Sequence, residues 1–324
     1  MVPAKAISFL MDAERFLVLT HINPDGDGLG SAMAMKCLLE RLGKKAEIVI
    51  DSEPPEMFAF FTNYEWVRQY GVETDGLEPF NTVISVDAPT IERLGDAAKL
   101  IADDANILCI DHHVSAKNFA DVNYIDGTAS ATAQMVYYLA SELNIAITPE
   151  TAEYLYTGIV IDTGRFRFSN TTPDVLHVAG ELVKAGADPD KISRHLYYNN
   201  TLETTQALGK LLETIELHFN GKVATAHFTH AYMLGDHWKN VDTEGFVNHA
   251  LSIRGVEVAM LLRETKTGIT RVSLRAKGGF DVNELAKIFG GGGHAKAAGL
   301  TINEPLEKAK KILLDETERT LKAG

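Results

Sequence analysis

Short apolar runs alternate with longer stretches of helical spacing through the first 190 residues of this 324-residue chain. Runs rich in Val, Ile and Leu that are bounded by polar residues predict buried strands. Four such strands are predicted, over 16–20, 46–50, 82–86 and 106–110. Helical spacing predicts helices over 29–43, 130–144 and 149–161. Strands that alternate with helices in this way are typical of a parallel α/β sheet.

The pattern changes beyond residue 170. The segment 171–215 is polar with helical spacing, and we expect the domain linker within it. Further strands are predicted near 222–229, 256–263 and 269–275, and further helices near 242–252, 281–289 and 305–322. The chain is therefore expected to form an α/β protein with a parallel-sheet domain over 1–190, a helical linker over 191–215 and a smaller α/β domain over 216–324.

Composition agrees with a folded protein of the cytoplasm. Apolar residues make up 45% and charged residues 23% of the chain, and no stretch reaches the roughly 18–20 apolar residues that a membrane span needs. The N-terminal segment carries Asp12, Glu14 and Arg15 within its apolar pattern, so we expect no secretory signal. Cys37 and Cys109 form no CxxC pair, which favours a reducing compartment and a structural role for both.

Charge is distributed unevenly. Residues 1–215 hold 16 Lys and Arg against 31 Asp and Glu, a balance of −15, whereas residues 216–324 hold 15 against 13, a balance of +2. The overall charge of −13 argues against a protein that coats long duplex nucleic acid. The acidic part is suited to cations, and the remainder tolerates an anion better.

Polar side chains follow four of the apolar runs. In parallel-sheet proteins, sites form just beyond the carboxyl ends of the strands. The four endings are His21, Asp25 and Asp27 after 16–20, Asp87 after 82–86, Asp111-His112-His113 after 106–110, and Asp162 after the apolar run 158–161. Each ending offers at least one side chain that can bind a metal ion.

Carboxylates and imidazoles together suit Mn²⁺, Mg²⁺, Fe or Zn. The single residue between Asp25 and Asp27 lets their carboxylates serve different ions. Two ions about 3.5–4 Å apart can activate a water molecule between them. Such a pair needs one carboxylate that touches both ions, and Asp87, alone at its strand end, is the natural candidate.

Each of these residues also has an ordinary structural interpretation. A lone Asp at a strand end is usually a turn residue or a helix N-cap. The segment 23–28 fits the opening of a calcium-binding loop, but Ala34 stands where that loop needs Glu. Adjacent His112 and His113 are harder to explain structurally, because two buried imidazoles both need partners. Taken together, the four endings favour a metal centre.

A glycine run provides a second candidate site. Four consecutive glycines over 290–293 expose backbone N–H groups and permit positive φ, as phosphate-binding loops require. No Gly-Lys-Ser/Thr follows, so this is not a Walker A loop, and a flexible loop is the alternative. His294 and Lys296 favour anion binding. Arg263 and Arg275, near the ends of predicted strands, could reach a shared cleft, although a solvated position is the default for either.

These motifs resemble the DHH family of phosphoesterases. HINPDGDG (21–28), Asp87, DHH (111–113) and GIVIDTGRF (158–166) match its four motifs in order, and GGGHAKAAG (291–299) matches the signature of the DHH-associated C-terminal domain. The compact layout is similar to the bifunctional oligoribonucleases and 3′-phosphoadenosine 5′-phosphate phosphatases of this family. The resemblance covers nearly the whole chain.

The resemblance implies two metal ions, usually Mn²⁺, that share one carboxylate. One ion would be held by His21, Asp25 and Asp87. The other would be held by Asp27, Asp87, His112 and Asp162. Asp87, His112 and His113 would be catalytic, with His113 facing the substrate phosphate.

The resemblance also places substrate binding in the smaller domain. The residues implied are Arg263, Arg275, Gly292, Gly293 and His294. The stretch SLRAK (273–277), which contains Arg275, matches the family pattern only loosely. We expect this domain to close over the metal site, with the active site in the cleft between the domains.

The function implied is hydrolysis of phosphodiester or terminal phosphate bonds by metal-activated water. The substrates would be short oligoribonucleotides (nanoRNA), 3′-phosphoadenosine 5′-phosphate, or both, with linear or cyclic dinucleotides as the alternative. The glycine-rich signature argues against a pyrophosphatase, and the complete ligand set argues against a non-catalytic nucleotide sensor. No membrane partner is expected, and a homodimer is one option that the sequence leaves open.

Overall fold

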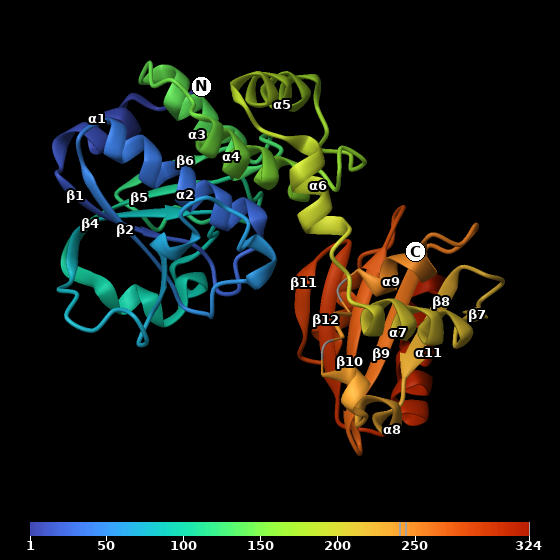
Figure 1. The fold of residues 1–324 in the computed structure, drawn as a ribbon. Helices are drawn as coiled ribbons and strands as arrows, with labels where there is room; N and C mark the ends of the chain where they lie inside the picture. The colour runs from blue at the N-terminus through green and yellow to red at the C-terminus, as the bar shows by residue number, and fades with distance from the viewer. Residues whose placement is uncertain (240, 244, 324) are drawn as a thin grey trace. The chain divides into compact units, whose positions relative to one another are not determined.

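The computed structural model describes residues 1–239, 241–243 and 245–323, without the side chains of His294 and residues 321–323. It divides into two compact units, Met1–Asn199 and Asn200–Gly324 (Figure 1). The boundary between them falls within the segment 171–215, which the sequence predicts to contain the linker. Each unit has its own sheet and its own core.

The first unit is built on a six-stranded sheet in the order β3-β2-β1-β4-β5-β6. All five pairings are parallel, which confirms the predicted parallel α/β sheet. Its strands are β1 (Arg15–Leu19), β2 (Lys45–Ile50), β3 (Val67–Gln69), β4 (Phe80–Val86), β5 (Ile101–Asp111) and β6 (Val122–Ile125). The two edge strands, β3 and β6, were not predicted from the sequence.

Helices cover this sheet, and both of its faces are buried. The six α-helices of the unit are α1 (Ala4–Asp12), α2 (Gly26–Arg41), α3 (Thr132–Glu142), α4 (Pro149–Asp162), α5 (Pro173–Ala185) and α6 (Pro189–Tyr197). Successive residues of β1 alternate between two cores, with Phe16 and Val18 in one and Leu17 and Leu19 in the other. The second core is closed by a 3₁₀ segment, η3 (Ile91–Leu100), and two further 3₁₀ turns are η1 (Glu56–Phe58) and η2 (Tyr64–Trp66).

The second unit contains a mixed six-stranded sheet in the order β11-β12-β10-β9-β8-β7. Among the strands described in this unit, β8 and β9 alone pair in parallel, and the other pairings are antiparallel. The strands are β7 (Glu216–His218), β8 (Val223–Phe228), β9 (Val258–Lys266), β10 (Ile269–Ala276), β11 (Gly292–His294) and β12 (Ala297–Ile302). The helical segments are α7 (Leu202–Glu213), α8 (His230–Met233), η4 (Asp236–Trp238), α9 (Phe246–Leu251), α10 (Val282–Ile288) and α11 (Leu306–Ala323).

The glycine run of this unit is only partly a loop. Gly292–His294 forms the edge strand β11, which pairs with β12 in antiparallel register. Gly293 has a φ of 150°, and a Cβ at this position would collide with the carbonyl oxygen of Ala297. A side chain is therefore excluded by the close approach of the two strands.

Within the described ranges, no helix combines the length and the apolar composition that crossing a lipid bilayer requires.

Candidate metal centre

Three neighbouring strands deliver most of the predicted ligands to one edge of the first sheet. His21 follows β1, Asp87 follows β4, and His112 follows β5, and these strands are adjacent in the order β1-β4-β5. Asp25 and Asp27 lie where the chain leaves β1 and begins α2. The convergence follows from topology, because parallel strands end at the same edge of a sheet.

The apolar run 158–161 suggested that Asp162 follows a strand, but Asp162 is placed at the site by a helix. It is the last residue of α4, so it lies at a helix end and not beyond a strand. The run 158–161 is apolar because this part of α4 is almost wholly buried, and a short buried run looks the same in a strand and in a helix.

The first group of ligands consists of His21, Asp25 and Asp87. The Nε2 atom of His21 lies 3.9 Å from Oδ1 of Asp25 and 3.6 Å from Oδ2 of Asp87. Two donors bound to one ion at about 2.0–2.2 Å lie roughly 3 to 4 Å apart. The spacing therefore fits three donors around a shared cation.

The second group consists of Asp27, His112 and Asp162. The Nε2 atom of His112 lies 2.9 Å from Oδ2 of Asp162 and 3.8 Å from Oδ2 of Asp27. The same nitrogen lies 3.6 Å from Oδ1 of Asp87. One oxygen of Asp87 thus faces His112 while its other oxygen faces His21, the arrangement that a bridging carboxylate needs.

Asp27 is oriented by helix α3. The backbone N–H groups of Thr132 and Ala133 donate to its two carboxylate oxygens at 2.6 and 2.8 Å. These are among the first N–H groups of α3, which have no partner within the helix, and the helix dipole favours a negative charge there. The carboxylate is fully buried, so this capping interaction fixes its position.

Asp87 is held by its backbone and by a neighbouring hydroxyl. Its φ of 55° is in the left-handed region, and its N–H donates to the carbonyl oxygen of Ile110 at 3.0 Å. The hydroxyl of Thr132 donates to Oδ1 of Asp87, also at 3.0 Å. Thr132 was not predicted as a site residue from the sequence. The only signal was a threonine near the start of a predicted helix, and its partners are distant in sequence.

His113 is held by the first residue of the DHH motif. Its Nδ1 lies 2.6 Å from Oδ1 of Asp111 and 3.6 Å from Oδ1 of Asp87. The backbone N–H of His113 also donates to Oδ1 of Asp111 at 3.1 Å. Asp111 is fully buried and fixes the orientation of the imidazole.

Burial and the repulsion of neighbouring carboxylates raise the pKa values of two acidic ligands, Asp27 and Asp162. Burial, together with Asp87 and Asp162, raises the pKa of Asp27 well above its ordinary value. Burial likewise raises the pKa of Asp162 to about 6, although a hydrogen bond from His112 opposes the shift. Crowded carboxylates with raised pKa values are the environment that a divalent cation relieves.

The pKa values of the imidazoles of His21 and His112 also rise, because the neighbouring carboxylates favour the protonated ring. Burial alone would lower the pKa of His21, but its interactions with Asp25 and Asp87 outweigh burial and raise the pKa to about 10. The pKa of His112 rises to about 10 for the same reason, with Asp162 as the main partner. The mixed nitrogen and oxygen donors fit divalent ions such as Mn²⁺, Mg²⁺, Fe²⁺ or Zn²⁺.

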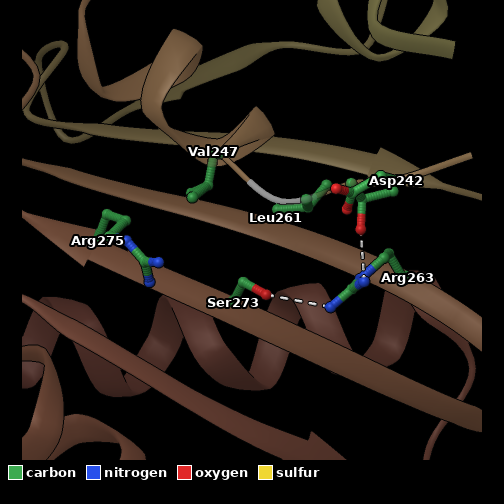
Figure 2. Close-up of a pocket in the computed structure, with 8 residues that line it drawn as sticks. Asp242, Val247, Leu261, Arg263, Ser273 and Arg275 are labelled. Atoms are coloured by element: carbon green, nitrogen blue, oxygen red, sulfur yellow. Dashed lines mark hydrogen bonds between the residues drawn. The ribbon is translucent and has the colours of Figure 1, made fainter. Parts of the chain in front are cut away.

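The second unit carries a separate group of basic residues around a pocket of about 280 Å³ (Figure 2). Arg263 on β9 donates to the hydroxyls of Thr243 at 2.7 Å and Ser273 at 3.2 Å. Arg275 on β10 lines the same pocket, so the structure brings together the two predicted arginines.

A second pocket of about 400 Å³ shares Arg263 and Ser273 with the first. Arg271 and the first two glycines of the run, Gly290 and Gly291, also line it. Arg271 was not predicted as a binding residue. It lies on the same face of β10 as Ser273 and Arg275, because residues two positions apart in a strand point to the same side.

The remaining predicted binding residues lie on the edge strand β11. Gly292 and Gly293 are part of this strand, and the side chain of His294 lies outside the described part of the structure.

Comparison with known proteins places the two units in a class of phosphoesterases. Residues 15–159 match the DHH family N-terminal domain, and residues 220–323 match the DHHA1 domain. The chain belongs to the DHH family of metal-dependent phosphoesterases, which confirms the resemblance read from the motifs.

Two relatives align with this chain over most of their length. The bifunctional oligoribonuclease and PAP phosphatase NrnA of Thermus thermophilus is 34% identical over 94% of this chain and 88% of its own. The Bacillus subtilis protein of the same name is 28% identical over 91% of each chain.

Solved structures share the fold. An exopolyphosphatase-related protein from Bacteroides fragilis is 25% identical, with a TM-score of 0.92 over 98% of this chain and 96% of its own. RecJ from Thermus thermophilus in complex with Mn²⁺ is 15% identical, with a TM-score of 0.56 over 97% of this chain and 53% of its own. The second likeness shows the fold alone.

Proposed function

We propose that this protein hydrolyses phosphodiester or terminal phosphate bonds in short oligoribonucleotides and in 3′-phosphoadenosine 5′-phosphate. The observation that carries the proposal is the pair of ligand groups that meet at the two oxygens of Asp87. The substrates are those named for the relatives from Thermus thermophilus and Bacillus subtilis.

The proposed cofactors are two Mn²⁺ ions. His21, Asp25 and Asp87 would hold one ion, and Asp27, Asp87, His112 and Asp162 would hold the other. When bound, such a pair supplies an activated water molecule and stabilises charge on the attacking and leaving oxygens.

The chain's own residues then position the reacting phosphate. His113, oriented by Asp111, is proposed to face the substrate phosphate, next to Asp87 and His112. In the second unit, Arg263 and Arg275 are proposed to bind substrate phosphates, together with Gly292, Gly293 and His294. Two hydroxyls hold Arg263 in place, which suits it to bind an anion in a defined geometry.

Replacing the shared carboxylate tests the two-ion proposal. Asp87→Ala should lower the Mn²⁺-dependent release of mononucleotides from an RNA dinucleotide by about 100-fold or more, because both ligand groups lose an oxygen. Asp103→Ala, which removes an exposed carboxylate of β5, is the matched control and should keep wild-type turnover. Undiminished turnover in Asp87→Ala with a native circular dichroism spectrum would refute the proposal.

A substrate panel distinguishes the proposed activity from its alternatives. Turnover of two- to five-nucleotide RNAs, 3′-phosphoadenosine 5′-phosphate, linear and cyclic dinucleotides and pyrophosphate would be compared with excess Mn²⁺. We expect the first two classes to be preferred. Preference for dinucleotides or for pyrophosphate would assign the chain to those activities, and binding without any turnover would indicate a sensor.

We also propose that the protein acts in the cytoplasm, where Cys37 and Cys109, both free thiols, would stay reduced. A homodimer is tested by sedimentation equilibrium, which separates 35.4 kDa from twice that mass.

A further inference from the structure

The loop 163–170 is fixed to the candidate metal centre at both ends. It begins directly after Asp162, and at its far end the side-chain amide of Asn170 donates to the carbonyl oxygen of Asp162 at 3.1 Å. The same amide donates to the carbonyl oxygen of Ser130 at 3.0 Å, just before α3. Any side chain on this loop is therefore positioned relative to Asp162.

The loop backbone is strained and held in place. Gly164, Arg165 and Phe166 have φ values of 55°, 63° and 59°, three left-handed residues in succession. The N–H of Arg165 donates to the carbonyl oxygen of Val160 at 2.7 Å, and the N–H of Phe166 donates to the hydroxyl of Thr163 at 3.1 Å. Such strain persists only where the surroundings fix the conformation, and it is often found at ligand-binding sites.

Phe168 is presented to solvent by this loop. Its residue surface is 57% exposed, whereas the other 13 phenylalanines of the chain are buried or partly buried. The ring rests on Gly164, where a Cβ would collide with it. One part of the Phe168 ring therefore packs against the backbone at Gly164, while the rest of the ring is exposed to solvent.

Two arginines on the same loop add positive charge to an otherwise acidic unit. The Nε–H of Arg167 donates to the carbonyl oxygen of Gly164 at 2.7 Å, and the Arg167 side chain is exposed. The guanidinium of Arg165 lies 3.5 Å from the ring centre of Tyr197 on α6. An exposed aromatic ring beside arginines is the combination that binds single-stranded nucleotides, because the ring stacks on a base and the cations attract the phosphate.

We propose that the loop 163–170 forms a nucleobase subsite, in which Phe168 stacks on a base of the substrate and Arg167 contacts the adjoining phosphate. The proposal rests on the proposed nucleotide hydrolase function. It assigns recognition of a base to the metal-binding unit, and it predicts that substrates without a base gain nothing from Phe168.

The test compares an RNA dinucleotide with the two dinucleotides that carry an abasic residue at one end or the other. Phe168→Ala should raise KM for the normal dinucleotide by about tenfold with little change in kcat, since stacking contributes mainly to binding. Phe168→Trp should restore KM. One of the two abasic substrates should show the same KM with wild type and Phe168→Ala. Val72→Ala, at an exposed apolar residue of the same unit, is the control and should leave KM unchanged.

A binding measurement separates this inference from the proposed function. EDTA is added to prevent turnover. The fluorescence that Trp adds in the Phe168→Trp variant is obtained by subtracting the wild-type signal. The dinucleotide should quench this added fluorescence, and inorganic phosphate should not. If wild type hydrolyses the dinucleotide and Phe168→Ala has the same KM, the subsite is refuted while the activity stands. If wild type hydrolyses no nucleotide, the activity is refuted, and absence of quenching would refute the subsite as well.

Discussion

Thr132 makes hydrogen bonds to two carboxylates of the candidate metal centre, those of Asp27 and Asp87. The backbone N–H of Thr132 donates to Asp27, and its hydroxyl donates to Asp87. Removing the side-chain hydroxyl therefore affects Asp87 alone, whereas the capping of Asp27 depends on the helix and not on the side chain. At the residue scale, a substitution of the Thr132 side chain can therefore test the orientation of Asp87 without removing the hydrogen bonds that hold Asp27.

Thr132→Val should weaken Mn²⁺ binding by about tenfold, because it keeps the volume of threonine and removes the donor that orients Asp87. Thr132→Ser keeps the hydroxyl and should restore most of the affinity. Isothermal titration calorimetry with Mn²⁺ measures the effect directly. Equal affinities for the valine and serine variants would show that the hydroxyl does not orient Asp87.

At the scale of elements, the packing of α4 against α2 and α3 sets the position of Asp27. A Cβ on Gly158 would lie 2.7 Å from Oδ1 of Asp27 and 2.8 Å from the Cβ of Ala133. This glycine is therefore required by the close approach of the helices. Glycine destabilises a helix relative to alanine, but any side chain at position 158 would displace the carboxylate of Asp27.

Gly158→Ala should lower the free energy of unfolding by about 1–3 kcal/mol, as expected for overpacking a buried contact. The control is Gly180→Ala in α5, where a Cβ meets nothing within 4 Å. That substitution should raise the free energy of unfolding by about 0.5–1 kcal/mol, since alanine favours the helix. Urea unfolding of both variants gives the comparison, and a stabilised Gly158→Ala would contradict the packing argument.

The elements also show what the sequence could and could not predict. The strands β1, β2, β4 and β5 were predicted because each contains a run rich in apolar residues that is bounded by polar ones. Edge strands of three or four residues, such as β3, β6 and β11, leave too little periodicity to detect.

The candidate sites divide in the same way. The acidic and imidazole residues are visible as a motif, whereas Thr132 acts on Asp27 across 105 positions and depends on the fold. Arg271 lies opposite Arg263 only because of the β9–β10 register, which the sequence does not fix.

At the scale of the whole molecule, the chain consists of two units with separate cores. The candidate metal ligands all belong to residues 1–199, and the basic pockets belong to residues 200–324. A ligand that binds only the folded form of one unit stabilises that unit by mass action, about 2.7 kcal/mol at 100 times its Kd.

Mn²⁺ should therefore slow amide hydrogen exchange mainly within residues 1–199, with the largest effect in α3 and in the strand ends beside the ligands. Hydrogen exchange with mass spectrometry resolves the two units in the intact chain. Asp87→Asn serves as the control and should lose most of the effect. Equal protection of both units in wild type would show that they are energetically coupled.

The attachment of Asp27 to the start of α3 has a consequence for how fast the centre takes up its ions. Protein groups alone fix the carboxylate, so an arriving ion meets ligand oxygens that are already in place. We therefore expect an arriving ion to shed water without requiring Asp27 to move. We expect the rate of loading to depend on how quickly the ion loses water and on the loss of protons from His21 and His112, whose pKa values are raised, rather than on movement of Asp27.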